Sequence, residues 1–150
     1  GAGLYVANTT LNNALTLAGN GWNEPTGFLG ALRFGAATYA GNITLGADAR
    51  IGAWSSSGNV SGAISGGHNL DFSSGTGTVH LTNNSNSYAG TTTVTGGVLS
   101  VGNGGTTGSL GSGSVTNNAN LTFNRSNAMT VGNAISGTGA VNQSGGGPRF

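Results

Sequence analysis

A doublet of one small residue and glycine recurs along the chain at nearly constant spacing. The six doublets, each Ala-Gly or Ser-Gly, are Ala18-Gly19, Ala40-Gly41, Ser65-Gly66, Ala89-Gly90, Ser112-Gly113 and Ser136-Gly137. Their glycines are separated by 22, 25, 24, 23 and 24 residues, which is a repeat length typical of solenoid proteins. The spacing therefore predicts a chain that is wound into stacked coils.

Residues that follow the doublets alternate in polarity with the period of a β-strand. The fourth residue after each of the last five glycines is apolar in four of five coils: Leu45, Leu70, Val94, Asn117 and Val141. The third and fifth residues are mostly small or polar, so one set of side chains is expected inside and the other outside. We expect two or three short strands per coil. The first coil breaks the pattern, because Pro25 stands where the interior of a strand would run.

Composition favours an ordered all-β chain. Glycine, with 31 of 150 residues, interrupts every candidate helix, and each glycine costs about 1 kcal/mol relative to alanine there. Disorder is the alternative for so polar a chain, but apolar residues make up 35% and recur in phase. The sequence therefore predicts an all-β solenoid of about six coils of 22 to 25 residues, with almost no helix.

Several classes of protein are disfavoured by what the chain lacks. It has no cysteine, which excludes disulfides and thiolate metal sites. No run of 18 apolar residues is present, so we expect no transmembrane segment. Four scattered arginines and no lysine neutralise few phosphates, so we expect no nucleic-acid partner. Because neither an initiating methionine nor a leader is present, we expect an internal fragment of a longer repetitive protein.

Residues 77 to 147 carry a set of motifs that resembles a known family. The motifs, in chain order, are Asn86-Ser87-Tyr88-Ala89-Gly90-Thr91-Thr92, Gly96-Gly97-Val98-Leu99, Val101-Gly102-Asn103-Gly104 and Gly108-Ser109-Leu110-Gly111. This region resembles the autotransporter-associated β-strand repeat, which occurs in passenger regions of bacterial proteins exported by type V secretion. The resemblance implies a right-handed parallel β-helix that is secreted or held at the bacterial outer-membrane surface, outside the cell.

The first half of the chain is similar to a weaker copy of the second. Ala63-Ile64-Ser65-Gly66 recurs as Ala134-Ile135-Ser136-Gly137, and Tyr39-Ala40-Gly41 matches Tyr88-Ala89-Gly90. The tyrosine and the following alanine are 24 residues apart in the first copy and 46 in the second, so we interpret the second copy as longer by one coil.

Two stretches depart from the repeat. Residues 20–37 match it poorly and are expected to be an irregular insertion, a loop or lid on the coil. Pro148-Arg149-Phe150 interrupt the point where another repeat strand would begin. We otherwise expect residues 1–150 to be a single β-helical segment.

Residues capable of chemistry are few. Asp48 and Asp71 are 23 residues apart, about one coil, and could form a carboxylate pair with Arg50 or Arg33 as the basic residue. Their offsets from the preceding glycines differ, however, and two unpaired surface aspartates are the simpler interpretation. His68 and His80 lack neighbours at metal-ligand spacing and are expected in turns or on the surface. We therefore expect no enzyme, and no catalytic, cofactor or metal site.

Two classes of function remain open. The first is a structural passenger segment: a rod or stalk in adhesion, or a fibre that associates through its open coil ends, where main-chain groups are unpaired. The second is a module that binds a host or matrix glycan, or another surface, on a face of the β-helix. Four aromatic residues could form a sugar-stacking platform, although stacking inside the coils explains the tyrosines more simply: Trp22, Trp54, Tyr39 and Tyr88. An ice-binding threonine series, Thr44, Thr93 and Thr116, is broken by Asn69 and Ala140.

Overall fold

A computed structural model of the chain describes residues 2–146. These residues form sixteen strands and no helix, and hence no helix that could cross a membrane. The strands are β1 (Leu4–Ala7), β2 (Thr10–Leu11), β3 (Leu15–Gly19), β4 (Asn23–Glu24), β5 (Gly27–Phe28), β6 (Leu32–Gly35), β7 (Ala37–Tyr39), β8 (Ile43–Gly52), β9 (Ser57–Val60), β10 (Ile64–Ser65), β11 (Leu70–Leu81), β12 (Thr92–Val101), β13 (Val115–Asn117), β14 (Asn120–Phe123), β15 (Ile135–Ser136) and β16 (Ala140–Gln143).

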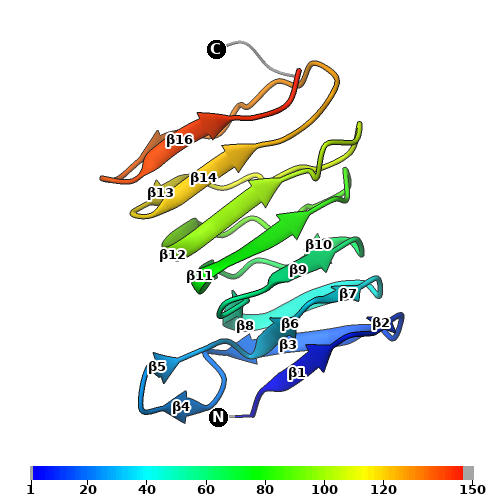
Figure 1. The fold of residues 1–150 in the computed structure, drawn as a ribbon, viewed down its shortest axis with the longest axis vertical. Coiled ribbons are helices and arrows are strands. Elements are labelled where there is room, and N and C mark those ends of the chain that lie inside the picture. The colour runs from blue at the N-terminus through cyan, green and yellow to red at the C-terminus, as the bar shows by residue number, and fades with distance from the viewer. Residues whose placement is uncertain (1, 147–150) are drawn as a thin grey trace.

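Fourteen of the strands belong to one sheet that winds around a common core as a stack of coils (Figure 1). Every pairing in this sheet is parallel, whereas β4 and β5 form a separate antiparallel hairpin. The all-β parallel solenoid predicted from the sequence is thus confirmed. Its handedness stays a prediction.

Each coil has up to three faces. Face 1 consists of β1, β6, the end of β8, the starts of β11 and β12, β13 and β15. Face 2 consists of β2, β7, β9, the ends of β11 and β12, β14 and β16. Six successive pairings connect the first segment of face 2 to the last. This number agrees with the expectation of about six coils.

Face 3 contains β3, the start of β8 and β10, and continues without regular strands. In this later part, asparagine side chains supply cross-coil hydrogen bonds. The Nδ2 of Asn83 donates to Ser61 O (2.8 Å) and the Nδ2 of Asn86 donates to Ser109 O (2.8 Å). Asn133 Nδ2 donates likewise to Gly111 O (2.9 Å). Face 3 is therefore held partly by side chains.

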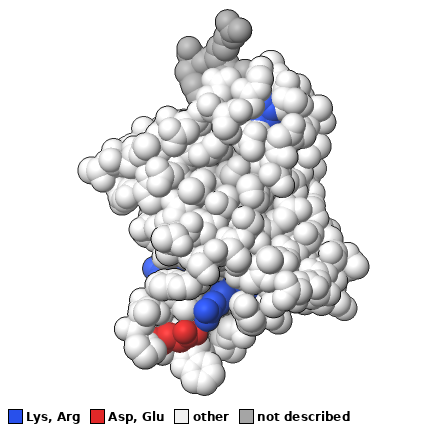
Figure 2. All heavy atoms as spheres, in the orientation of Figure 1, with Lys and Arg blue, Asp and Glu red and all other residues white. Residues whose placement is uncertain are grey.

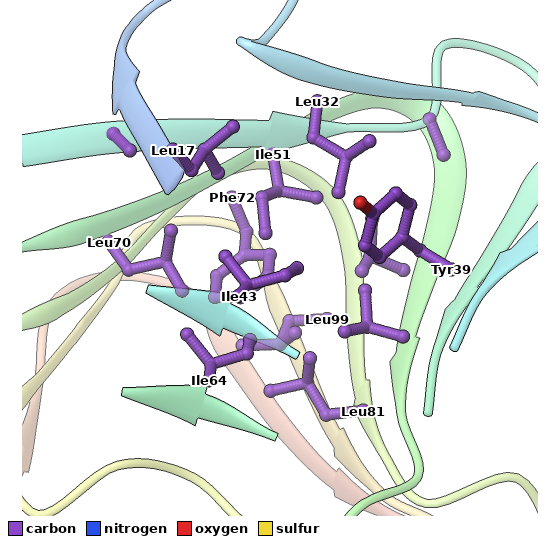
Figure 3. Packing of buried hydrophobic residues seen from close by; sticks show 14 of the residues in the cluster. Leu17, Leu32, Tyr39, Ile43, Ile51, Ile64, Leu70, Phe72, Leu81 and Leu99 are labelled. Atoms are coloured by element: carbon purple, nitrogen blue, oxygen red, sulfur yellow. The ribbon is translucent and has the colours of Figure 1, made fainter. Parts of the chain in front are cut away.

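The core consists of columns of apolar side chains that point inward from successive coils (Figure 3). Leu32, Ile51, Phe72 and Val94 form one column on face 1, and all four are fully buried. The next position of this column is Asn117, which is also buried. Its amide is satisfied, because Nδ2 donates to Ala140 O (2.8 Å) and Oδ1 accepts from Ala119 N (3.3 Å). At this position the solenoid thus buries a polar side chain with its hydrogen bonds intact.

The alternation predicted from the sequence is confirmed. Leu45, Leu70, Val94 and Asn117 are buried, whereas Val141, on the last strand, is 46% exposed. The residues on either side of these positions are half-buried or exposed. The strand period thus separates core from surface as expected.

The six doublets do not stack above one another in one column. The inference from their spacing, that they occupy equivalent positions in successive coils, is therefore wrong. A Cβ at Gly113 would meet the backbone of Gly90, but Gly66 lies over Leu45 and Gly137 over Asn117. From β8 onward, paired residues are 20 to 23 positions apart. In the first coil they are 28 apart, or 30 for Gly19 and Ala49, because the hairpin lies within it.

The repeated Ala-Ile-Ser-Gly motif also occupies two different places. Ile64 pairs with Ile43 on face 3, whereas Ile135 pairs with Val115 on face 1. The two copies are therefore not equivalent in the solenoid, and the interpretation that the second copy is longer by one coil is wrong. Pro148, Arg149 and Phe150 lie outside the described residues.

Two residues other than glycine adopt positive φ at the same corner of consecutive coils. Asn8 (φ 51°) lies between β1 and β2, and Ala36 (φ 56°) lies between β6 and β7. Asn8 N donates to Gly35 O (3.1 Å), so the two corners are stacked. Asparagine tolerates this left-handed conformation, whereas alanine pays a steric penalty in it.

We therefore expect Ala36→Gly to raise the free energy of unfolding by about 1 kcal/mol, since glycine adopts positive φ without that penalty. Urea denaturation followed by circular dichroism measures the change. Ala18→Gly, at an exposed strand position, is the matched control and is expected to lower stability by about 0.5–1 kcal/mol. Destabilisation by both variants would contradict the argument.

Candidate functional site

The hairpin β4–β5 projects from the coil near the N-terminal end (Figure 1). Asn23 pairs with Phe28 and Glu24 with Gly27, so Pro25 and Thr26 form the turn. Proline suits the second position of a β-turn, and Gly27 supplies the positive φ (98°) that closes it. Pro25, which breaks the repeat, is therefore the first residue of the hairpin turn.

Two arginines from face 1 attach this hairpin to the coil. Arg33 on β6 donates from Nη1 to Glu24 Oε1 (2.6 Å). Arg50 on β8 donates from Nη1 to the carbonyl of Phe28 (2.8 Å) and from Nε to Asp71 Oδ2 (2.6 Å). In Figure 2, acidic and basic atoms adjoin near this end, whereas most of the visible surface is uncharged. Three of the charged residues, Glu24, Arg33 and Arg50, thus position the hairpin.

A small pocket of about 130 Å³ lies between the hairpin, β1 and β6. Its lining includes Tyr5, Trp22, Glu24 and Arg33. The Arg33 guanidinium lies over the Tyr5 ring, with Cζ 5.3 Å from the ring centroid, a cation–π contact. Tyr5 and Trp22 are 60% and 72% exposed, which is unusual for large aromatic residues. The pocket therefore combines aromatic surface with a hydrogen-bonding ion pair.

The four aromatic residues considered as a sugar platform fall into two groups. Tyr39 and Tyr88 are buried in the core, as the alternative interpretation expected, and burial raises the pKa of both hydroxyls. Trp22 and Trp54 are exposed, but only Trp22 lines the hairpin pocket. A platform made of all four is therefore excluded.

Asp48 and Asp71 do not form a carboxylate pair. Asp71 pairs with Arg50 in the ladder and also accepts from Thr95 Oγ1 (2.9 Å). Asp48 accepts from the backbone N–H and the side-chain amide of Asn69 (both 2.9 Å), which lower the pKa of its carboxyl. Each aspartate thus has its own partners, and neither is paired with the other.

The histidines lie apart from each other. His68 is exposed in a bend, with Nδ1 3.8 Å from Asp48 Oδ1. His80 lies on β11 instead of in a turn, and burial lowers its pKa below the ordinary value of imidazole. Its Nδ1 is 3.4 Å from the carbonyl oxygen of Gly102. Over residues 2–146, no three histidine or acidic side chains are placed to hold a metal ion together.

A wide polar groove of about 650 Å³ runs over face 2 of the first coils. Outward side chains of one ladder line it, among them Thr10, Thr38, Asn59 and His80. The threonines of the proposed ice-binding series do not share a ladder. Thr93 pairs with Thr116 on face 1, whereas Thr44 lies on face 3.

Taken together, one continuous parallel ladder and an apolar core of stacked columns define a β-solenoid repeat protein. Residues 74–101, from β11 to the end of β12, match the passenger-associated-transport-repeat family. The chain therefore carries an autotransporter passenger repeat, as the motifs around Tyr88 and Gly96 predicted.

A second comparison agrees with this. Over 63 residues, 42% of the chain, the sequence is 49% identical to the BmaC autotransporter adhesin of Brucella suis biovar 1 (strain 1330). The match spans 2% of the length of that relative. No solved structure matches the chain.

The sequence did not reveal the pocket, because it forms between residues that are distant along the chain. Neither Tyr5 nor Glu24 belongs to a sequence motif that predicts a site. One signal was present: a Pro-Thr-Gly turn between Glu24 and Arg33, in the one coil that departs from the repeat.

Proposed function

We propose that the chain is a structural, non-catalytic passenger segment of an autotransporter-like surface protein, acting outside the cell as a rod or stalk in adhesion. The observation that carries this proposal is the uninterrupted parallel ladder from β2 to β16 on face 2. In such a stack each coil is stabilised by its neighbours, so the stack gains length without requiring a globular core. The passenger repeat and the adhesin relative support the extracellular location.

We also propose that the isolated segment associates through its coil ends. At the N-terminal end, Leu4, Leu15 and Leu17 line an open hollow of about 320 Å³. At the other end, all four residues of β16 are exposed, including Val141. Exposed strand edges beside exposed apolar groups form a template for another chain. Because the two ends differ, their contact does not close on itself and produces fibres.

Negative-stain electron microscopy and light scattering of the 150-residue chain test the association. We expect filaments from the unmodified chain and from Thr106→Lys, a charge placed in an exposed lateral loop. Val141→Lys places the same charge on the terminal strand and is expected to leave mostly monomers. Monomers from the unmodified chain at high concentration, or filaments from all three, would refute end-to-end association.

A second candidate function is binding of a host or matrix glycan on face 2. The groove there favours it, since threonine, asparagine and histidine side chains suit the hydroxyl groups of an extended saccharide. A glycan array distinguishes this function from a purely structural one. Binding on face 2 gives a signal that Thr38→Ala and Asn59→Ala reduce, whereas a segment that binds no glycan on this face gives no signal that depends on these two residues.

A further inference from the structure

We infer that the hairpin pocket is a binding site for one neutral hexopyranose unit of a glycan. The site is separate from the face 2 groove, and it adds a specific ligand to the structural role proposed above. It does not depend on self-association. Four features support it: its size, its aromatic surface, its hydrogen-bonding groups and its fixed geometry.

The size of the pocket suits one sugar ring. The pocket measures about 130 Å³. Pockets for larger organic ligands usually measure about 300–1,000 Å³. The site is therefore too small for a helix or a large cofactor, and we expect one sugar ring at the end of a chain to enter it with part of the ring left in solvent.

The walls of the pocket offer the aromatic surface that a pyranose requires. A pyranose ring carries C–H groups on its faces and hydroxyl groups around its edge, and the C–H groups pack well against an aromatic ring. Trp22 is 72% exposed and Tyr5 is 60% exposed, and both line the pocket. Rigid amphipathic rings of this kind provide contact area at low entropic cost.

Hydrogen-bonding capacity comes from the ion pair. The ion pair uses one donor of Arg33, Nη1, and one acceptor of Glu24, Oε1. A guanidinium has five donors and a carboxylate about four acceptor positions, so both groups can also bind adjacent hydroxyls. The pair is electrically balanced, which favours a neutral sugar over an acidic one.

The pocket is held in place before any ligand binds. Arg50 on β8 binds the Phe28 carbonyl and so attaches the hairpin to the coil. At the base of the hairpin, Gly21 and Gly30 form a β-bridge. A Cβ at Gly21 would overlap the backbone of Gly30, so this base is closely packed. A preorganised site loses less entropy on binding, which matters for a ligand as small as one sugar.

The test is a ¹H–¹⁵N NMR titration of the full chain, in which the two tryptophans give two indole N–H signals. Glucose, galactose and mannose are the neutral probes, and galacturonate is the acidic comparison. We expect at least one neutral hexose to shift the Trp22 signal saturably while the Trp54 signal stays in place. Glu24→Gln, which removes the charge of the carboxylate, is expected to weaken binding about tenfold.

Trp22→Ala and Trp54→Ala form a matched pair of variants. We expect Trp22→Ala to abolish binding, followed through the amide signals of the pocket, and Trp54→Ala to leave it unchanged. The inference is overturned if no neutral hexose shifts the Trp22 signal, if both indoles respond equally, or if galacturonate binds more tightly. The filament assay reads out the proposed structural role independently, so failure of one proposal leaves the other standing.

Discussion

Replacing Phe72 by alanine is expected to lower the free energy of unfolding by about 3–5 kcal/mol, the usual cost of deleting a buried aromatic ring. Phe72 is fully buried, and it lies between Ile51 and Val94 in the face 1 column. The cavity would therefore remove contacts from the coils on both sides of β11. Urea denaturation monitored by circular dichroism measures the loss as a lower midpoint at unchanged slope.

Phe28→Ala is the matched control for this prediction. Phe28 lies on the hairpin and is 40% exposed, and only its backbone carbonyl binds Arg50. We expect a loss below about 1 kcal/mol, as is usual for residues outside the core. Equal losses for the two phenylalanines would show that the face 1 column does not carry the stability described here.

Gly77→Ala is expected to lower the free energy of unfolding by about 2–3 kcal/mol, near the upper end for inserting one carbon into a packed site. A Cβ at Gly77 would overlap the carbonyl oxygens of Ala53 and Ser56 in the preceding coil. These are backbone atoms, so relief requires a shift of the chain. Such a shift would also strain the hydrogen bond from Gly77 N to Trp54 O (3.0 Å).

Gly105→Ala provides the comparison, because no atom lies within 4 Å of the Cβ it would gain. The expected change is within about 0.5 kcal/mol. Thermal unfolding of both variants beside the unmodified chain measures the difference. Similar melting temperatures for the two variants would mean that the close approach of the two coils at Gly77 does not require glycine.

The inside and outside of the solenoid could be predicted from the sequence, because side chains alternate along any extended strand. Leu70 and Val94 were placed inside on this basis, and Tyr39 and Tyr88 followed as the bulky residues of the coil interior. Even Asn117, which looked like an exception, occupies the expected inward position. The period of a strand is fixed by backbone stereochemistry and needs no knowledge of the neighbouring coils.

The register between coils could not be predicted in the same way. Glycine is required wherever two coils approach closely, and this occurs at several corners, so glycines at similar spacing belong to different columns. Asp48 and Asp71 illustrate the consequence. They are 23 positions apart, but the local pairing joins residues 21 apart, so Asp71 meets Arg50 and Asp48 binds Asn69.

The hairpin pocket was beyond prediction because its residues meet only in three dimensions. Glu24 and Arg33 are separated by a turn and by the return of the chain to face 1. Tyr5 reaches them through the pairing of β1 with β6, 28 positions further along. Single-sequence patterns report on neighbours within one strand or turn, so such long-range contacts leave no local signal.

Asparagine side chains hold the later coils together on face 3, and this has a consequence for how such proteins diverge. The path from face 2 back to face 1 takes 10 positions from Val60 to Leu70 and 14 from Val101 to Val115, yet the strands on both other faces stay paired. Side-chain bonds from Asn86 and Asn133 tolerate this difference where a strict main-chain ladder would not. Insertions can therefore be accommodated on this one side of the solenoid while the strand pairing of the other two faces is unchanged.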